Sequence, residues 1–169
     1  MAVYQLNEQQ ILPARSEEVW DFISSPANLR EITPAYMGFE ITSRDLPEKM
    51  YPGMIITYRV KPVLGIPLTW VTEITHVKPG VYFVDEQRVG PYVMWHHEHF
   101  IEPLETGVRM RDRVTYRLPL GILGRLAHRI FIRKQLEGIF NHRRKALEKR
   151  FGGSNYPSEQ LETSNMAGI

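Results

Sequence analysis

The residues of this chain best suited to chemistry are two histidines and one aspartate on two neighbouring segments. His97 and His99 belong to residues 94–101, and Asp112 belongs to residues 108–117. In the second segment Val108, Met110, Asp112, Val114 and Tyr116 alternate with arginines and a threonine. A period of two indicates a half-buried β-strand, with the acid on its apolar face. Titratable groups on the inner face of a sheet favour a lined cavity over a plain core.

The turn between the segments sets their pairing. Reading residues 103–106 as a turn pairs Glu102 with Gly107, which places His97 opposite Asp112 and His99 opposite Met110. Directly opposed side chains on one face lie close enough to interact. The residues predicted to line this face and to contact a ligand are Trp95, His97, His99, Met110, Asp112, Val114 and Tyr116.

Three uses of this cluster are open from the sequence. A charge-assisted hydrogen bond between His97 and Asp112 would fix the imidazole tautomer and raise its basicity. The pair could simply brace the hairpin, since buried polar groups satisfy one another. It could instead orient a polar group of a ligand. It could also act on a carbonyl or enolisable substrate, with His97 as base, Asp112 as its orienter and Tyr116 as proton donor.

Metal binding is a weaker alternative at the same place. His97 and His99 are two residues apart on one strand, so both rings could converge on one ion with a carboxylate opposite. Two histidines with one further ligand are a weak signal. We therefore predict no metal and no cofactor.

Length and composition indicate one globular domain. The chain has 169 residues, of which 43% are hydrophobic and 24% charged, which is ordinary for a globular protein. We expect a domain over residues 1–152 and a disordered tail over 153–169, where branched apolar residues are scarce. A net charge of +2 is too small to argue for nucleic acid. The basic run His142-Arg143-Arg144-Lys145 is expected to be a solvated helix face.

The expected location is the cytoplasm. The chain has no cysteine, which excludes disulfides and thiolate metal sites and fits a reducing compartment. We find no apolar stretch long enough for a transmembrane helix and no signal-peptide pattern at the start.

The order of elements predicts an α+β fold. A first strand over residues 2–12 precedes two short helical segments, one from Ser16 to Ile23 and one after Pro26. Strands are expected over 39–43, 53–60, 68–77 and 81–89, before the hairpin described above, and such spacing indicates an antiparallel meander. From about Ile122 to Phe151 the pattern becomes helical. This helix of about 30 residues would be about 45 Å long. Its apolar first half is expected to lie across the sheet and its basic end in solvent.

The sequence resembles the START-like SRPBCC superfamily, which has the helix-grip fold and includes polyketide cyclase-like proteins. The resemblance covers about residues 3–150. The block from Gly107 to Gly121 is similar to a bacterial subgroup whose members are described as cell-division inhibitors or are fused to epimerase-like domains. The residues that carry the resemblance are Pro13-Ala14, Glu17, Val19-Trp20 and Phe22, then Gly90-Pro91-Tyr92, Trp95, His97 and His99, then Gly107-Val108, Met110, Asp112, Val114, Tyr116 and Leu118-Pro119-Leu120-Gly121.

The resemblance implies a curved antiparallel sheet of six to seven strands wrapped around a long C-terminal helix, with a deep apolar cavity between them. Because such folds host lipid carriers, hormone receptors and cyclases, the fold alone does not settle the function. The first hypothesis is binding of a hydrophobic small molecule, lipid-like or aromatic and polyketide-like. The second is a cyclase or hydratase that uses the His–Asp pair. The third is an interaction module that uses the apolar loop 62–67 as a dimer or partner contact, together with the basic end of the C-terminal helix.

Overall fold

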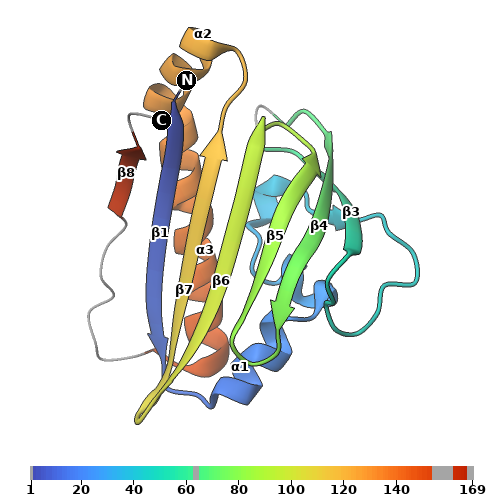
Figure 1. Cartoon of the computed structure of the whole chain (residues 1–169), viewed down its shortest axis with the longest axis vertical. Coiled ribbons are helices and arrows are strands. Elements are labelled where there is room, and N and C mark those ends of the chain that lie inside the picture. Colours follow the sequence, from blue (N-terminus) through green and yellow to red (C-terminus); the bar gives the residue numbers. More distant parts are fainter. Residues whose placement is uncertain (1, 63–64, 154–161, 167–169) are drawn as a thin grey trace.

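A single antiparallel sheet forms the frame of the molecule in the computed structural model, which describes residues 2–62, 65–153 and 162–166 (Figure 1). Its strand order is β2-β3-β4-β5-β6-β7-β1-β8. The strands are β1 (Val3–Leu12), β2 (Glu40–Ile41), β3 (Met54–Val60), β4 (Leu68–Lys78), β5 (Tyr82–Val89), β6 (Met94–Leu104), β7 (Gly107–Arg117) and β8 (Glu162–Met166). β2 to β7 are successive neighbours, as predicted for a meander, and β1 closes onto β7.

The helices lie on one face of this sheet. Helix α1 (Ser16–Ile23) and the short 3₁₀ segments η1 (Pro26–Arg30) and η2 (Ala35–Met37) follow β1. The chain after β7 forms α2 (Gly121–Ala127), a π-helical segment η3 (His128–Ile132) and α3 (Arg133–Phe151), which continue into one another (Figure 1). The predicted α+β helix-grip arrangement is confirmed. No helix in the described part of the chain is long and apolar enough to cross a membrane.

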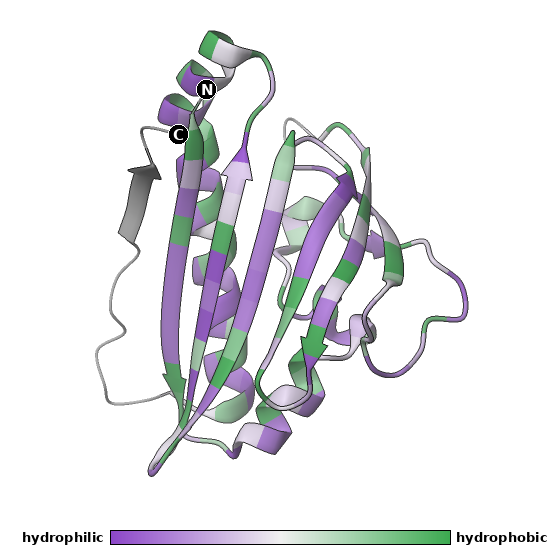
Figure 2. Cartoon of the chain, viewed as in Figure 1, coloured by the Kyte–Doolittle hydropathy of each residue, from purple (hydrophilic) through white to green (hydrophobic). Residues whose placement is uncertain are grey.

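The prediction of which half of the C-terminal helix covers the sheet was wrong. In α3 the side chains of Leu136, Phe140 and Leu147 are buried against the sheet. Most apolar residues of α2 and η3 are exposed instead, because α2 extends past the end of the sheet (Figures 1 and 2). Arg143, predicted to be solvated, is buried. An apolar pattern identifies a hydrophobic helix face, but it does not show where the sheet beneath that face ends.

The predicted register of the β6–β7 hairpin is off by two residues. Leu104 pairs with Gly107, so His99 lies opposite Asp112 and His97 opposite Val114. The turn consists of the two residues 105–106, where the prediction used four. A shift of two residues keeps every side chain on its predicted face, because the side-chain period of a strand is also two.

The tail and the loop 62–67 are described only in part. Residues 154–161 and 167–169 lie outside the described residues, while β8 pairs with the outer edge of β1. The open edge of β1 offers the backbone groups for this pairing, and the disordered tail expected over residues 153–169 stays a prediction. Residues 63–64 of the loop also lie outside the described residues. Of its neighbours, Ile66 is exposed, and the Pro62 carbonyl accepts a hydrogen bond from Gln135 of α3.

Candidate functional site

A cavity of about 180 Å³ lies between the inner face of the sheet, the segment from α1 to η2 and helix α3. Most of its wall is apolar, and three aromatic residues gather on one side, with ring centroids 5.5 Å apart for Trp70 and Trp95 and 4.8 Å apart for Tyr92 and Trp95. Charged groups come to the wall at one place only among the described residues. The lining side chains include Ile23, Leu29, Ile32, Met37, Phe39, Met50, Ile56, Tyr58, Val60, Trp70, Thr72, Ile74, Phe83, Asp85, Tyr92, Trp95, His97, His99, Gln135, Leu136, Ile139, Phe140 and Arg143.

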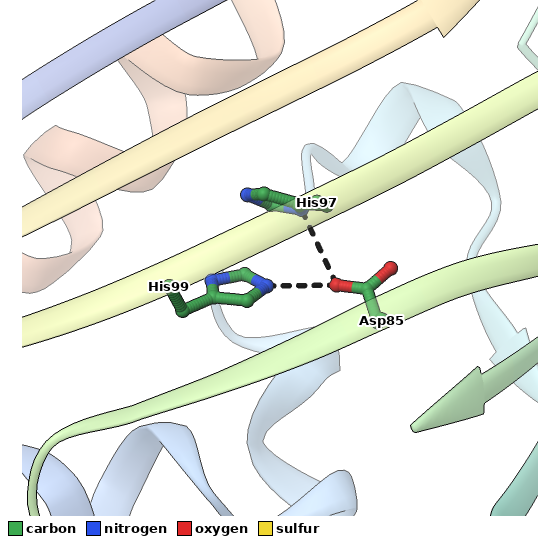
Figure 3. A group of neighbouring side chains, drawn as sticks. All are labelled: Asp85, His97 and His99. Carbon is green, nitrogen blue, oxygen red and sulfur yellow. Dashed lines mark hydrogen bonds and ion pairs between the residues drawn. The ribbon is translucent and has the colours of Figure 1, made fainter. Parts of the chain in front are cut away.

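Asp85 of β5 meets the two histidines of β6 on this wall (Figure 3). Its Oδ2 accepts a hydrogen bond from His99 Nε2 at 2.7 Å and lies 3.3 Å from His97 Nδ1. The two imidazole centroids are 3.7 Å apart. Both histidines are buried, so one carboxylate oxygen serves two rings in a site largely withdrawn from water.

Asp112 of β7 holds the opposite side of the same rings. Its Oδ1 lies 3.1 Å from His97 Nε2, 2.7 Å from His99 Nδ1 and 3.3 Å from Arg143 Nη2. Arg143 Nη2 is also 3.2 Å from His99 Nδ1. Each imidazole therefore stands between two carboxylates, and a buried guanidinium adds a positive charge from the helix.

These contacts decide the charge states. Burial acts to raise the pKa of Asp112, but the Arg143 guanidinium and the hydrogen bonds from the histidines hold that pKa well below its usual range. Burial likewise opposes ionisation of Asp85, and the charge on His97 overcomes it, so the pKa of Asp85 is lowered. Burial acts to lower the pKa of His97, but Asp85 and Asp112 raise it. The two carboxylates therefore favour the protonated form of His97, and the positive groups around them favour the ionised form of both aspartates.

The predicted site residues fall into two groups. Trp95, His97 and His99 line the cavity, and Asp112 stands behind the histidines. Met110, Val114 and Tyr116 are not among the residues of this cavity wall: they are fully or almost fully buried where β7 runs beneath the C-terminal helix. The Tyr116 hydroxyl lies 2.8 Å from His128 Nε2, away from His97.

Two members of the cluster were not predicted. Asp85 lies on a predicted strand, and only the pairing of β5 with β6, which puts it opposite His97, shows its role. Its signal in the sequence was an acid two residues after Phe83, and therefore on the same face of the predicted strand. Arg143 lies within a basic run, and nothing local distinguishes it from Arg144 or Lys145. The position of Arg143 follows only from the packing of α3 on the sheet.

A family model described as "Domain of unknown function (DUF8410)" matches residues 10–151. No curated protein matches the chain. The solved structures that it resembles share its fold at low sequence identity. Protein CV1439 from Chromobacterium violaceum has a TM-score of 0.66 and 13% identity, with 89% of this chain and 99% of that chain covered.

Two further structures connect the fold to the resemblance seen in the sequence. A START superfamily protein from Mycobacterium smegmatis has a TM-score of 0.63 and 14% identity, covering 88% of this chain and 97% of that one. A nucleoside-diphosphate sugar epimerase from Corynebacterium glutamicum has a TM-score of 0.59 and 18% identity, covering 85% of this chain but 28% of that one. The fold is therefore START-like, as the motifs predicted.

Proposed function

This chain belongs to the family described as "Domain of unknown function (DUF8410)", which states no activity, and from its site we propose that it binds a hydrophobic small molecule with one polar end. The START-like fold supports ligand binding in general. The observation that carries the finer proposal is an apolar, aromatic-walled cavity with charged groups at one place on its wall. Such a wall provides affinity through apolar contact, and the few polar groups set orientation.

The size of the cavity limits the ligand. An apolar cavity of about 150 Å³ accommodates benzene, so about 180 Å³ suits a compact aromatic molecule or a short acyl chain.

The same contacts support orientation of a ligand over acid–base catalysis. A general base needs a ring nitrogen with a free lone pair, yet both nitrogens of His97 face carboxylates. Tyr116, the proton donor of the cyclase hypothesis, is engaged with His128 instead. His97 is thus arranged to present positive charge rather than to accept a proton.

The test fills the cavity without touching the cluster. Ile139 of α3 lines the cavity and is only partly buried, so Ile139→Trp would occupy ligand volume. Native mass spectrometry would detect a co-purified molecule, and calorimetric titration with indole, a compact aromatic probe, would report the free cavity. We expect the variant to lose both signals while its thermal unfolding midpoint stays near that of the wild type.

The matched control is Ile122→Trp, which adds the same side chain to an exposed position outside the cavity wall. It should keep both signals. Unchanged probe binding by a folded Ile139→Trp variant would contradict the proposal.

A further inference from the structure

We propose that Asp85, His97 and His99 form a binding site for a divalent transition-metal ion of the Zn²⁺ type. One ligand atom from each residue lies within 4.8 Å of the other two (Figure 3). All three residues line the cavity, so the coordination positions that the protein leaves open would face the cavity. This inference goes beyond small-molecule binding and does not depend on it.

The distances are close to those that a metal requires. Two ligands at about 2.1 Å from a tetrahedral ion stand about 3.4 Å apart. His97 Nδ1 and Asp85 Oδ2 are already 3.3 Å apart. His99 Nε2 and Asp85 Oδ2 are 2.7 Å apart, so the ion would widen this contact by roughly 0.7 Å. A small side-chain rotation is sufficient for that change.

The outer contacts of the rings match those of metal-binding histidines. Such histidines donate their second ring N–H to a carboxylate or carbonyl, which fixes the tautomer and the ring orientation. Here the nitrogens that face away from Asp85, His97 Nε2 and His99 Nδ1, both lie against Asp112 Oδ1. Arg143 in turn anchors Asp112. The two metal-facing nitrogens are thereby held toward Asp85 before any ion binds.

Charge and ligand type select the ion. A histidine ligand must be neutral, so the ion displaces the proton of His97. The carboxylates of Asp85 and Asp112 then leave two negative charges in the site, and Arg143 offsets one of them. A cation is therefore favoured. Two imidazoles with one carboxylate suit Zn²⁺, Fe²⁺, Co²⁺ or Ni²⁺, whereas Mg²⁺ and Ca²⁺ prefer oxygen ligands throughout.

Co²⁺ is the probe for the test, because its visible absorption reports a protein-bound ion directly. Protein treated with a chelator and then dialysed would be titrated with Co²⁺ and next with Zn²⁺ as competitor. We expect one ion per chain, with absorption bands that Zn²⁺ removes. Asp85→Asn and His99→Gln should each weaken binding by at least about tenfold, and Asp112→Asn by about 10–100-fold.

The matched control is His96→Gln, which alters the neighbouring histidine that pairs with Glu86 on the other face of β6. It should bind Co²⁺ like the wild type. Absence of Co²⁺ bands in the wild type would overturn the proposal whatever the variants do, and so would equal affinity in a folded Asp85→Asn protein. The cavity-filling variant Ile139→Trp should still bind the metal, which separates failure of this site from failure of ligand binding.

A different surface carries a second inference. The projecting helix, residues 121–132, begins past the end of the sheet (Figure 1), and most of its apolar side chains are exposed. Ile122 is 73% exposed, Leu123 66% and Ile130 66%. Leu120, just before it, is 76% exposed and adopts a positive φ of 64°, a conformation that costs a leucine energy. Because this exposure and this strain weaken the folded state, they point to a use outside the domain itself.

We infer that the projecting helix docks on an anionic membrane surface. No acidic residue occurs between Asp112 and Glu137, and the cations of the helix and of the turn that follows it are Arg125, Arg129, Arg133 and Lys134, of which Arg133 also pairs with Glu137. An apolar helix face flanked by cations is typical of helices that lie in a membrane interface. A second copy would bring the same positive charge and be repelled, so charge favours the membrane over self-association.

Vesicle co-sedimentation tests this surface. The wild type should bind vesicles of phosphatidylcholine with phosphatidylglycerol, bind pure phosphatidylcholine less, and lose binding as salt is raised. The double variant Leu123→Ser and Ile130→Ser should bind at least about tenfold more weakly. The control, Ile55→Ser and Val89→Ser, removes exposed apolar residues from β3 and β5 and should bind normally. Equal binding by both double variants, concentration-dependent dimerisation in place of binding, or no binding by the wild type would overturn the inference.

Discussion

At the scale of single residues, the contact between His97 and Asp112 could be predicted, but the full cluster could not. Alternation places both side chains on the inner face, and that prediction survives a register error of two residues. Asp85 and Arg143 enter through β5 and α3, whose approach depends on long-range packing. The sequence therefore predicts which faces meet and leaves out the partners that arrive from other elements.

The carboxylate of Asp112 should be important for stability. It accepts contacts from His97, His99 and Arg143 in a buried site, so Asp112→Asn would leave buried positive charge without its counter-charge. Losing one partner of a buried ion pair costs about 3–5 kcal/mol in the free energy of unfolding. Urea denaturation would measure the loss.

The control for Asp112→Asn lies on the outer face of the same hairpin. Glu98→Gln weakens the partly exposed pair with Arg113, and such surface pairs contribute about 1 kcal/mol or less. Equal losses of unfolding free energy in the two variants would show that the buried network contributes no more to stability than a surface ion pair.

His128 should give stability a pH dependence of known sign. Its ring stacks on Tyr4, and its Nε2 accepts the Tyr116 hydroxyl proton, which only a neutral ring can do. Burial, together with the nearby Arg133 charge, lowers the pKa of His128. The unfolded chain then binds the proton more readily, with a pKa of about 6.5. Its contribution is therefore complete above about pH 6.5 and is lost as the pH falls through the lowered value.

The substitution His128→Gln keeps a hydrogen-bond acceptor and removes the titrating group. The wild type should lose stability relative to this variant between about pH 7 and pH 5, measured as a difference in unfolding free energy. The contributions of other ionisable groups cancel in that difference. A difference that stays constant over this range, or grows in the opposite direction, would contradict the assignment.

At the scale of elements, the type and order of the strands and helices follow from periodicity, and their placement does not. The helical pattern after residue 121 is correct, yet the half that covers most of the sheet is α3, because α2 lies beyond the end of the sheet. An exposed apolar helix has the same sequence pattern as a buried one. Only tertiary structure distinguishes them, which is why the projecting helix was not expected.

Two glycines of this C-terminal helix should respond to alanine in opposite ways. A Cβ at Gly124 would lie 2.0 Å from the carbonyl oxygen of Pro119, whereas a Cβ at Gly138 meets nothing within 4 Å. Gly124→Ala should therefore destabilise the protein by about 1–3 kcal/mol through overpacking. Gly138→Ala should stabilise it by about 0.5–1 kcal/mol, since alanine loses less backbone entropy in a helix. Thermal unfolding of the two variants checks both signs, and a shared sign would refute the close approach at Gly124.

At the scale of the whole molecule, we expect the domain to fold without β8. β1 pairs with β7 from Tyr4 to Leu12, whereas β8 adds pairing only from Val3 to Asn7 on the outer edge. A chain ending at Gly153 should keep its circular dichroism spectrum, with an unfolding midpoint within about 2–4 °C, the shift expected for about 1 kcal/mol. A chain ending at Arg144 lacks the buried Leu147, so its unfolding midpoint should be far below that of the chain ending at Gly153. Aggregation of the chain that ends at Gly153 would show instead that β1 must pair with β8 to stay monomeric, because an unpaired strand edge is a template for association.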